Sequence, residues 1–162
     1  MKKTVVIFSI LALFFGCMSY VAASEYIKFS SRFIKHFKDC DAYKEEVSSE
    51  YDSKEFIEKR EIVGWKNGFC HYRTTMKTNN SSYMLDCMFS DVQVNEIYKA
   101  MKSSYKSVEE YNLDILVPNK DAKSGGVEFK KIGVTPIRGN KAYIVWSKYQ
   151  NNPYFCRPQK LQ

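Results

Sequence analysis

The stretch that decides the fold is residues 62–72, Ile-Val-Gly-Trp-Lys-Asn-Gly-Phe-Cys-His-Tyr. Its Asn67-Gly68 pair suits a type I′ turn, because both central residues of that turn need positive φ, and such turns join antiparallel strands. Residues 55–63 alternate and carry β-branched side chains, and residues 69–76 are rich in Thr and aromatic residues. Residues 83–89 add a third run with apolar side chains on one face. The pattern therefore predicts a three-stranded antiparallel meander.

Helical periodicity flanks this meander on both sides. Residues 26–38 carry apolar residues close to helical spacing and basic residues on a different arc, which predicts an amphipathic helix. Residues 41–53 are polar and are expected to form a loop. Ser90 and Gln93 form a capping box, which starts a second helix. The apolar residues beyond it recur every three or four positions: Val94, Ile97, Met101, Tyr105 and Val108.

The C-terminal third has weaker signals. Residues 111–117 are expected to form a short strand, and residues 118–126 form a polar, Gly-rich stretch. Residues 142–149 predict a helix that stops at Asn151-Asn152-Pro153, with a strand as the rival interpretation. We therefore expect an α+β fold: an N-terminal helix, a three-stranded antiparallel meander, a packed helix, and a C-terminal helix pinned by a disulfide.

The first two dozen residues have the features of an export signal. Lys2-Lys3 supplies the positive charge, residues 5–15 form an apolar run, and Val21-Ala22-Ala23 offers small residues for cleavage. A membrane anchor is the competing interpretation, but it needs about 20 apolar residues and this run is shorter. We expect a signal peptide over residues 1–24 and a single disulfide-stabilised α+β domain over residues 25–162.

Lipidation is a second alternative for the same segment. Residues 13–17, Leu-Phe-Phe-Gly-Cys, resemble a bacterial lipobox, with a Gly before the Cys but with Phe14 and Phe15 matching the box poorly. We therefore expect a periplasmic or secreted bacterial protein, with attachment to a lipid anchor through Cys17 as the less favoured option. On this interpretation, a membrane is a partner only if Cys17 is lipidated.

Four cysteines lie outside the signal, and they indicate two disulfides formed in an oxidising compartment. Four cysteines allow three connectivities. We favour Cys70–Cys87, because both are expected on adjacent strands joined by the polar turn 79–82. This choice leaves Cys40–Cys156, which would tie the end of the first helix to the C-terminal tail.

The charge pattern and the motifs exclude several kinds of chemistry. The net charge of +7 falls to +5 when Lys2 and Lys3 are removed with the signal, so nucleic acid is not an expected partner. Acidic residues lie mostly among lysines, as in residues 44–46 and 58–61, which is typical of a solvated surface. Nucleophile elbows, Walker loops and zinc-protease motifs are absent from the sequence, and His36 and His71 stand apart. We expect no catalytic residues, no metal ligands and no cofactor.

The sequence is similar to a group of small exported bacterial proteins. The similarity rests on residues 62–72, on Cys87-Met88-Phe89, on Ala100-Met101, on residues 145–149, and on an Asn-Pro pair followed by the closing Cys156. The resemblance covers most of the chain after the signal. It implies a shared fold and export, and it implies no activity, because the shared residues are cysteines, a turn and packing aromatics.

Three hypotheses for function follow from these features. The leading one is a non-catalytic binding protein of the cell envelope or secretome, whose partner is a protein or a cell-wall polymer. Trp65, expected to be partly exposed at the hairpin turn, is the candidate ligand-contact aromatic. The second is an inhibitor of an envelope or host hydrolase that inserts a disulfide-braced loop such as residues 117–126. The third is a hydrolase with a dispersed site.

Overall fold

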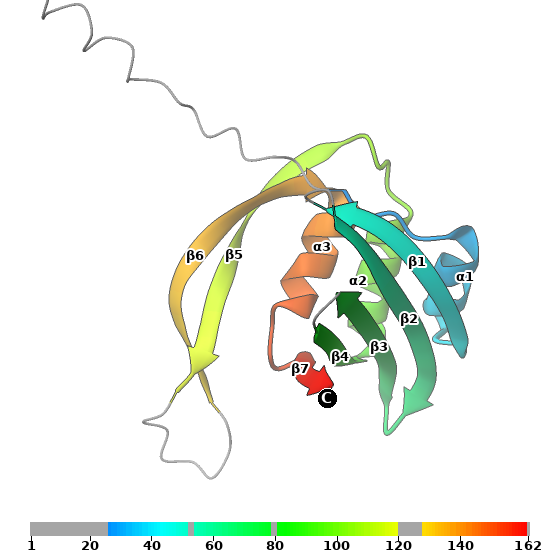
Figure 1. The fold of residues 1–162 in the computed structure, drawn as a ribbon, viewed down its shortest axis with the longest axis horizontal. Coiled ribbons are helices and arrows are strands. Elements are labelled where there is room, and N and C mark those ends of the chain that lie inside the picture. Colours follow the sequence, from blue (N-terminus) through cyan, green and yellow to red (C-terminus); the bar gives the residue numbers. More distant parts are fainter. Residues whose placement is uncertain (1–25, 52–53, 79–80, 120–127, 162) are drawn as a thin grey trace, which may run out of the picture.

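The predicted hairpin lies at the centre of a five-stranded antiparallel sheet (Figure 1). The computed structural model describes residues 26–51, 54–78, 81–119 and 128–161. Asn67 and Gly68 both have positive φ and form the two-residue turn, with Lys66 opposite Phe69. In order across the sheet, the strands are β1 (Tyr43–Tyr51), β2 (Lys54–Lys66), β3 (Phe69–Thr78), β4 (Ser81–Phe89) and β7 (Cys156–Leu161).

Three helices lie against one face of this sheet, which we call the inner face (Figure 1). They are α1 (Ser31–Asp39), α2 (Asp91–Met101) and α3 (Lys141–Gln150). The capping box of α2 forms as predicted: the Ser90 side chain accepts from the Gln93 N–H, and the Gln93 side chain accepts from the Ser90 N–H. Local sequence signals therefore fix where this helix begins.

A long hairpin of two strands stands apart from the main sheet. It consists of β5 (Val108–Pro118) and β6 (Phe129–Asn140), which pair with each other as a separate antiparallel sheet. Figure 1 shows the hairpin arching to one side of α3 and beyond the edge of β7. At its base, β6 runs directly into α3, and Asn140 is the N-cap of that helix. The hairpin is therefore anchored at its base, while most of its side chains are exposed or half-buried.

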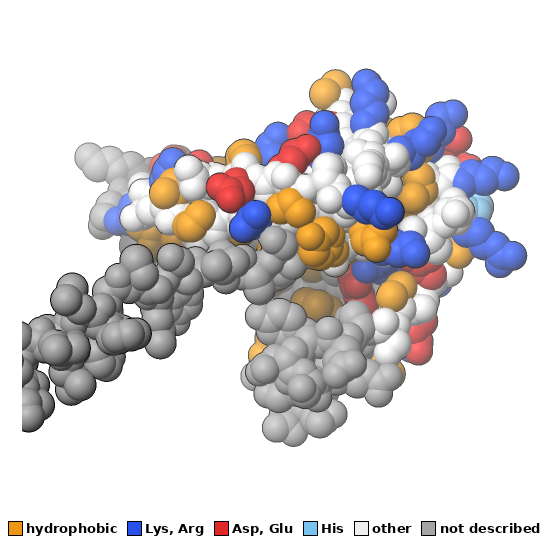
Figure 2. Space-filling model, turned by 90° about the horizontal axis from the view of Figure 1, so that it is seen from above, with side chains coloured by type: hydrophobic (Ala, Val, Ile, Leu, Met, Phe, Trp, Pro, Cys, Tyr) orange, Lys and Arg blue, Asp and Glu red, His pale blue; other side chains and the backbone are white. Residues whose placement is uncertain are grey.

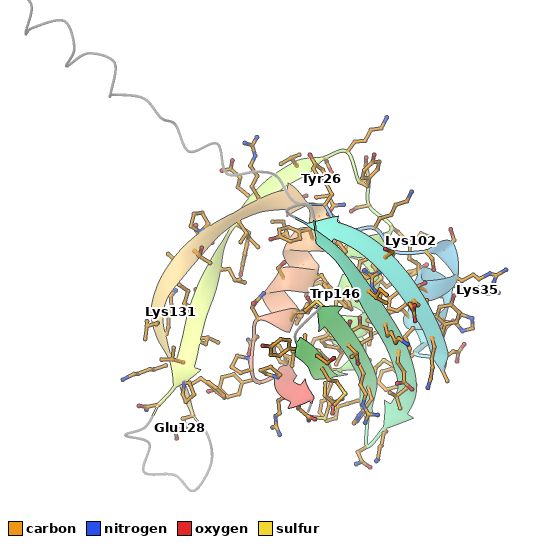
Figure 3. The ribbon with its side chains drawn as sticks, in the orientation of Figure 1. Tyr26, Lys35, Lys102, Glu128, Lys131 and Trp146 are labelled. Atoms are coloured by element: carbon orange, nitrogen blue, oxygen red, sulfur yellow. A yellow bond between two sulfur atoms is a disulfide. The ribbon has the colours of Figure 1, made fainter. Side chains whose placement is uncertain are left out.

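The core lies between the inner face and the helices. Trp146 of α3 occupies its centre (Figure 3), with its ring centroid 5.0 Å from that of Tyr72 and 6.0 Å from that of Phe37. Phe33 and Phe37 are both buried, so the apolar arc of α1 faces the sheet. One row of side chains across the sheet forms the floor of this core: Tyr43, Ile62, Tyr72, Cys87 and Cys156.

The α+β class is confirmed, but the predicted layout is wrong in several places. The sheet has five strands and not three, and α2 ends at Met101, before Tyr105 and Val108 of its expected apolar row. Residues 41–53 were expected to loop, and they contain β1, because the inward-facing Glu45 pairs with Arg60 and hides the alternation of the strand. The first helix begins at Ser31, because the Asn140 side chain binds both backbone groups of Ile27 and holds that segment extended. The chain also ends in β7, so the last disulfide pins a strand and not a helix.

The favoured disulfide pairing is also wrong. The structure pairs Cys40 with Cys70 and Cys87 with Cys156. The register of β3 on β4 puts Cys70 opposite Phe89, two residues away from Cys87. Cys87 lies directly opposite Cys156 on β7, with a Cα–Cα distance of 4.0 Å. Two disulfides indicate folding in an oxidising compartment, as expected.

Several predictions fall outside the described residues. They include the signal peptide over residues 1–24, the lipidation of Cys17, and the segment 120–127 between β5 and β6. Among the described residues, no helix has both the length and the apolar character needed to cross a membrane.

Candidate binding groove

A groove separates the β5–β6 hairpin from the edge of the main sheet. Its volume is about 810 Å³, which is within the range of pockets that hold small molecules or short peptide segments. Most of its lining is apolar: Met76, Leu85, Leu116, Pro118, Phe129, Pro153, Tyr154 and Pro158. Polar groups are contributed by Gln150, Asn151 and Arg157. This composition suits the burial of apolar groups with a few oriented polar contacts.

The groove exists because the sheet extends beyond the helices. Past the buried core row, the next two rows of inward-facing side chains are Glu45, Arg60, Thr74, Leu85 and Pro158, then Val47, Glu58, Met76 and Tyr83. Met76 is 47% exposed and Tyr83 is 45% exposed, although they lie on the same face as the fully buried Tyr72 and Cys87. On β3 and β4, this end of the inner face is therefore partly uncovered and carries the apolar side chains of Met76, Tyr83 and Leu85.

The hairpin forms the opposite wall of the groove and is fixed to the body near its tip. The backbone N–H of Phe129 donates a hydrogen bond to the Tyr154 hydroxyl at 3.1 Å. The two rings also meet edge to face, with centroids 5.2 Å apart. Tyr154 lies in the turn between α3 and β7, so this contact joins the two walls at one end of the groove.

The third wall is the free edge of β7. Met88 N–H donates to the Phe155 C=O, so hydrogen-bonded pairs of β4 and β7 fall on alternate residues. The backbone groups of Cys156, Pro158 and Lys160 therefore point away from β4, toward the open edge. Proline has no N–H, and the Cys156 N–H already donates to the Asn152 C=O. Along residues 156–158 the edge thus offers carbonyl acceptors and no free donor.

A buried charged cluster borders the floor of the groove. Arg60 donates to Glu58 at 2.6 Å and to Glu45 at 3.4 Å, and Thr74 donates to Glu58 at 2.9 Å. Burial works to lower the pKa of Arg60, but the hydrogen bond and charge of Glu58 outweigh it, so the pKa of the guanidinium is raised. The cluster holds the extended N-terminal segment, because Arg60 also donates to the Lys28 C=O.

Within the described residues, two polar atoms of this cluster have no hydrogen-bond partner of good geometry. They are Nε of Arg60 and the hydroxyl of Tyr72, and both atoms are buried. Burial is the main reason that the pKa of Tyr72 is raised, so the phenol stays neutral. In the sheet register, Thr74 lies opposite Leu85 and Glu58 lies opposite Met76, which places the charged cluster beside the floor of the groove.

The outer face of the sheet has a second, smaller hollow of about 470 Å³. Its charges are paired across the strands: Lys44 with Glu61 at 2.9 Å, and Lys59 with Glu46 at 3.1 Å. These pairs are exposed or half-buried, and such surface pairs contribute little energy. The hollow is therefore a solvated charged surface, as the sequence predicts for Lys44, Glu46, Lys59 and Glu61. The same prediction is wrong for Glu45, Glu58 and Arg60, whose side chains pair with one another on the inner face.

Trp65 and the two histidines singled out in the sequence lie away from the groove, whereas Cys156 lines it. Trp65 is 46% exposed, and its indole N–H donates to the Asp39 C=O at 3.0 Å. It stands near the β2–β3 turn, at the opposite end of β2 from Glu58. The His36 ring stacks on Tyr43 with centroids 4.6 Å apart. No group of His, Cys, Asp and Glu suited to a metal ion occurs in the part of the chain that the structure describes.

The groove itself was not predicted, because its lining comes from four distant parts of the chain between residues 76 and 158. The prolines Pro118, Pro153 and Pro158 are the one local signal, since proline is common at strand edges and at the ends of elements. Comparison with protein-family models, curated proteins and solved structures found no match to this chain. Function is therefore inferred from the geometry of the groove.

Proposed function

We propose that the protein is a non-catalytic binding protein of the cell envelope or secretome that holds an extended segment of a protein partner in the groove. The observation that carries the proposal is the position of the groove along the free edge of β7. An unpaired strand edge recognises extended peptides through backbone hydrogen bonds, and flanking pockets take alternate side chains. Both features meet here, because the apolar floor and the hairpin wall lie beside that edge.

The edge also restricts the chemistry of the bound segment. Cys156 and Pro158 present carbonyl acceptors, so the incoming strand has to supply the N–H donors at these positions. Its side chains alternate in direction, so apolar residues at every second position would lie on the inner face beside Pro158. We therefore expect a peptide with apolar residues at positions i and i+2.

Binding is favoured over catalysis by the side chains of the groove. General acid–base chemistry uses a carboxylate or a histidine placed against the substrate. Among the described lining residues, the groups that carry or exchange a proton are Tyr154 and Arg157, since Cys156 is in a disulfide. The Tyr154 hydroxyl already accepts from the Phe129 N–H, so it serves to position the hairpin.

Selection from a displayed library of random peptides tests the proposal. We expect enriched peptides with apolar residues at alternate positions. Leu116→Ala should weaken their binding about tenfold, because a buried leucine contributes about 1.5–3 kcal/mol. Ile132→Ala is the matched control, since Ile132 lies on the same hairpin, is mostly exposed and does not line the groove. Equal affinities for the two variants, or no enriched peptides, would contradict the proposal.

The projecting hairpin also supports the inhibitor alternative. A hairpin that extends beyond the body can present residues 117–119 to an enzyme cleft (Figure 1). Disulfide bracing is not the means, because both disulfides lie in the main sheet and at the end of α1. An inhibitor should abolish the activity of a hydrolase at a near-stoichiometric ratio. If an excess of the protein leaves the turnover of that hydrolase unchanged, the inhibitor alternative is excluded for that enzyme.

A further inference from the structure

A second surface, remote from the groove, combines exposed aromatic and basic residues. The chain enters the structure at Tyr26, whose ring contacts that of Tyr105 with centroids 6.2 Å apart. Tyr26 is 51% exposed and Tyr105 is 55% exposed. Exposed basic side chains flank this pair along the chain. We call the whole set the aromatic–basic patch: Tyr26, Lys28, Arg32, Lys102, Tyr105 and Lys106.

The positive charge of this patch is not neutralised by the protein. None of its four basic residues forms an ion pair with an acidic residue in the part of the chain that the structure describes. Lys102 makes a cation–π contact, with its ammonium 5.4 Å from the centroid of the Tyr98 ring, and this contact leaves its charge unpaired. By contrast, lysines on the outer face of the sheet are paired, as Lys44 is with Glu61.

The fold brings the patch together from two separate elements. Lys28 is fixed because its C=O accepts from Arg60, and Arg32 lies on the outward side of the first turn of α1. Lys102 and Lys106 follow the end of α2, which packs beside α1. Figure 3 places Tyr26 and Lys102 on the upper side of the molecule, and Figure 2 shows Lys and Arg side chains spread over the α1–α2 half of that side.

From this arrangement we propose that the aromatic–basic patch docks the protein on an anionic phospholipid surface. The charge is complementary, since lipid phosphates attract basic residues that lie on one face. The exposed tyrosine pair favours a bilayer over a soluble polyanion, because tyrosine rings settle at the headgroup level of membranes. Residues 1–25 join the structure at Tyr26, so a lipid on Cys17 would lead into the same patch. This contact does not depend on that lipid, nor on the proposed groove function.

Vesicle sedimentation of the full-length protein tests this proposal. The vesicles contain equal parts of phosphatidylglycerol and phosphatidylcholine, or phosphatidylcholine alone. Each basic residue near an anionic surface contributes about fivefold in partitioning, so Lys28→Gln with Lys106→Gln should lower binding to the anionic vesicles about 25-fold. The matched control is Lys66→Gln with Lys130→Gln, which removes the same charge from exposed positions outside the patch.

The expected result is strong salt-sensitive binding to the anionic vesicles, the loss in the patch variant, and a change below about fivefold in the control. Residues 1–24 include Lys2 and Lys3, which also favour anionic vesicles, but their contribution is the same in all these proteins and cancels when the two double variants are compared. Equal binding to neutral and anionic vesicles would overturn the proposal. So would equal losses in the two double variants, or capture by immobilised heparin without binding to vesicles. None of these results bears on peptide binding, which Leu116→Ala reports separately.

Discussion

Replacing Arg60 by methionine should be among the most damaging single changes in this protein. The guanidinium is buried and lies 4.7 Å from the centroid of the Phe29 ring. It is also the one basic side chain that binds Glu45 and Glu58 among the described residues, and it donates to the Lys28 C=O. Methionine fills a similar volume but leaves both carboxylates without a positive partner.

The size of the effect follows from those contacts. Removing one partner of a buried ion pair destabilises a protein by about 3–5 kcal/mol, because a charge is left buried and unpaired. The lost contact between Arg60 and the Phe29 ring contributes about 0.5–2 kcal/mol and overlaps with that loss. We therefore expect Arg60→Met to lower the free energy of unfolding by about 4 kcal/mol at neutral pH.

Urea unfolding at pH 7, followed by tryptophan fluorescence, measures this change. Lys59→Met is the matched control, because Lys59 is the neighbouring residue on the outer face and its exposed pair with Glu46 is worth at most about 1 kcal/mol. Adding Glu58→Gln to Arg60→Met should restore part of the loss, since it removes one of the unpaired charges. If Arg60→Met costs no more than the Lys59 control, the cluster does not hold the fold together as we argue.

Three further predictions concern the disulfides, the pH response and the exposed tryptophan. Replacing Cys87 and Cys156 together by alanine opens a loop of 69 residues and should cost about 4 kcal/mol in urea unfolding; a loss below 1 kcal/mol would contradict that pairing. Partial burial works to raise the pKa of Glu96, but hydrogen bonds from two side chains of α3 outweigh it and lower the pKa. The ionised Glu96 carboxylate should therefore stabilise the protein above its usual pKa, and this stabilisation should be lost as the pH falls through the lowered pKa. The free energies of unfolding in urea of Glu96→Gln and of the unchanged protein should then differ at pH 7 and converge in acid. A difference that stays constant with pH would refute this. If a cell-wall polymer is a partner, Trp65→Ala should reduce retention on purified wall material, and unchanged retention would remove Trp65 as the contact.

Local signals in the sequence were sufficient for about half of the fold. The turn at Asn67-Gly68 and the capping box at Ser90 are decided by residues within four positions of each other, and both form as predicted. The strand over residues 111–117 and the helix over residues 142–149 are also confirmed, as β5 and α3. These elements need no knowledge of distant contacts.

The remaining elements depend on partners far away in the chain. The sequence predicts that Glu45 is exposed to solvent. In the structure its side chain faces inward from β1, because Arg60 on the neighbouring strand pairs with it. The disulfide pairing depends on strand register, which places Cys87 opposite Cys156 on a strand without a clear sequence signal. The groove depends most on distant contacts, because residues that line it are brought together only by the complete fold.

The most direct test of the groove proposal is backbone hydrogen exchange at Lys160. Its N–H points toward the open edge of β7, whereas the N–H groups of Arg157 and Gln159 face β4. With a saturating amount of the tightest peptide from the displayed library, exchange of the Lys160 amide should slow markedly, and exchange at Arg157 and Gln159 should change little. Unchanged exchange at Lys160 with the peptide bound would contradict pairing of the partner with β7.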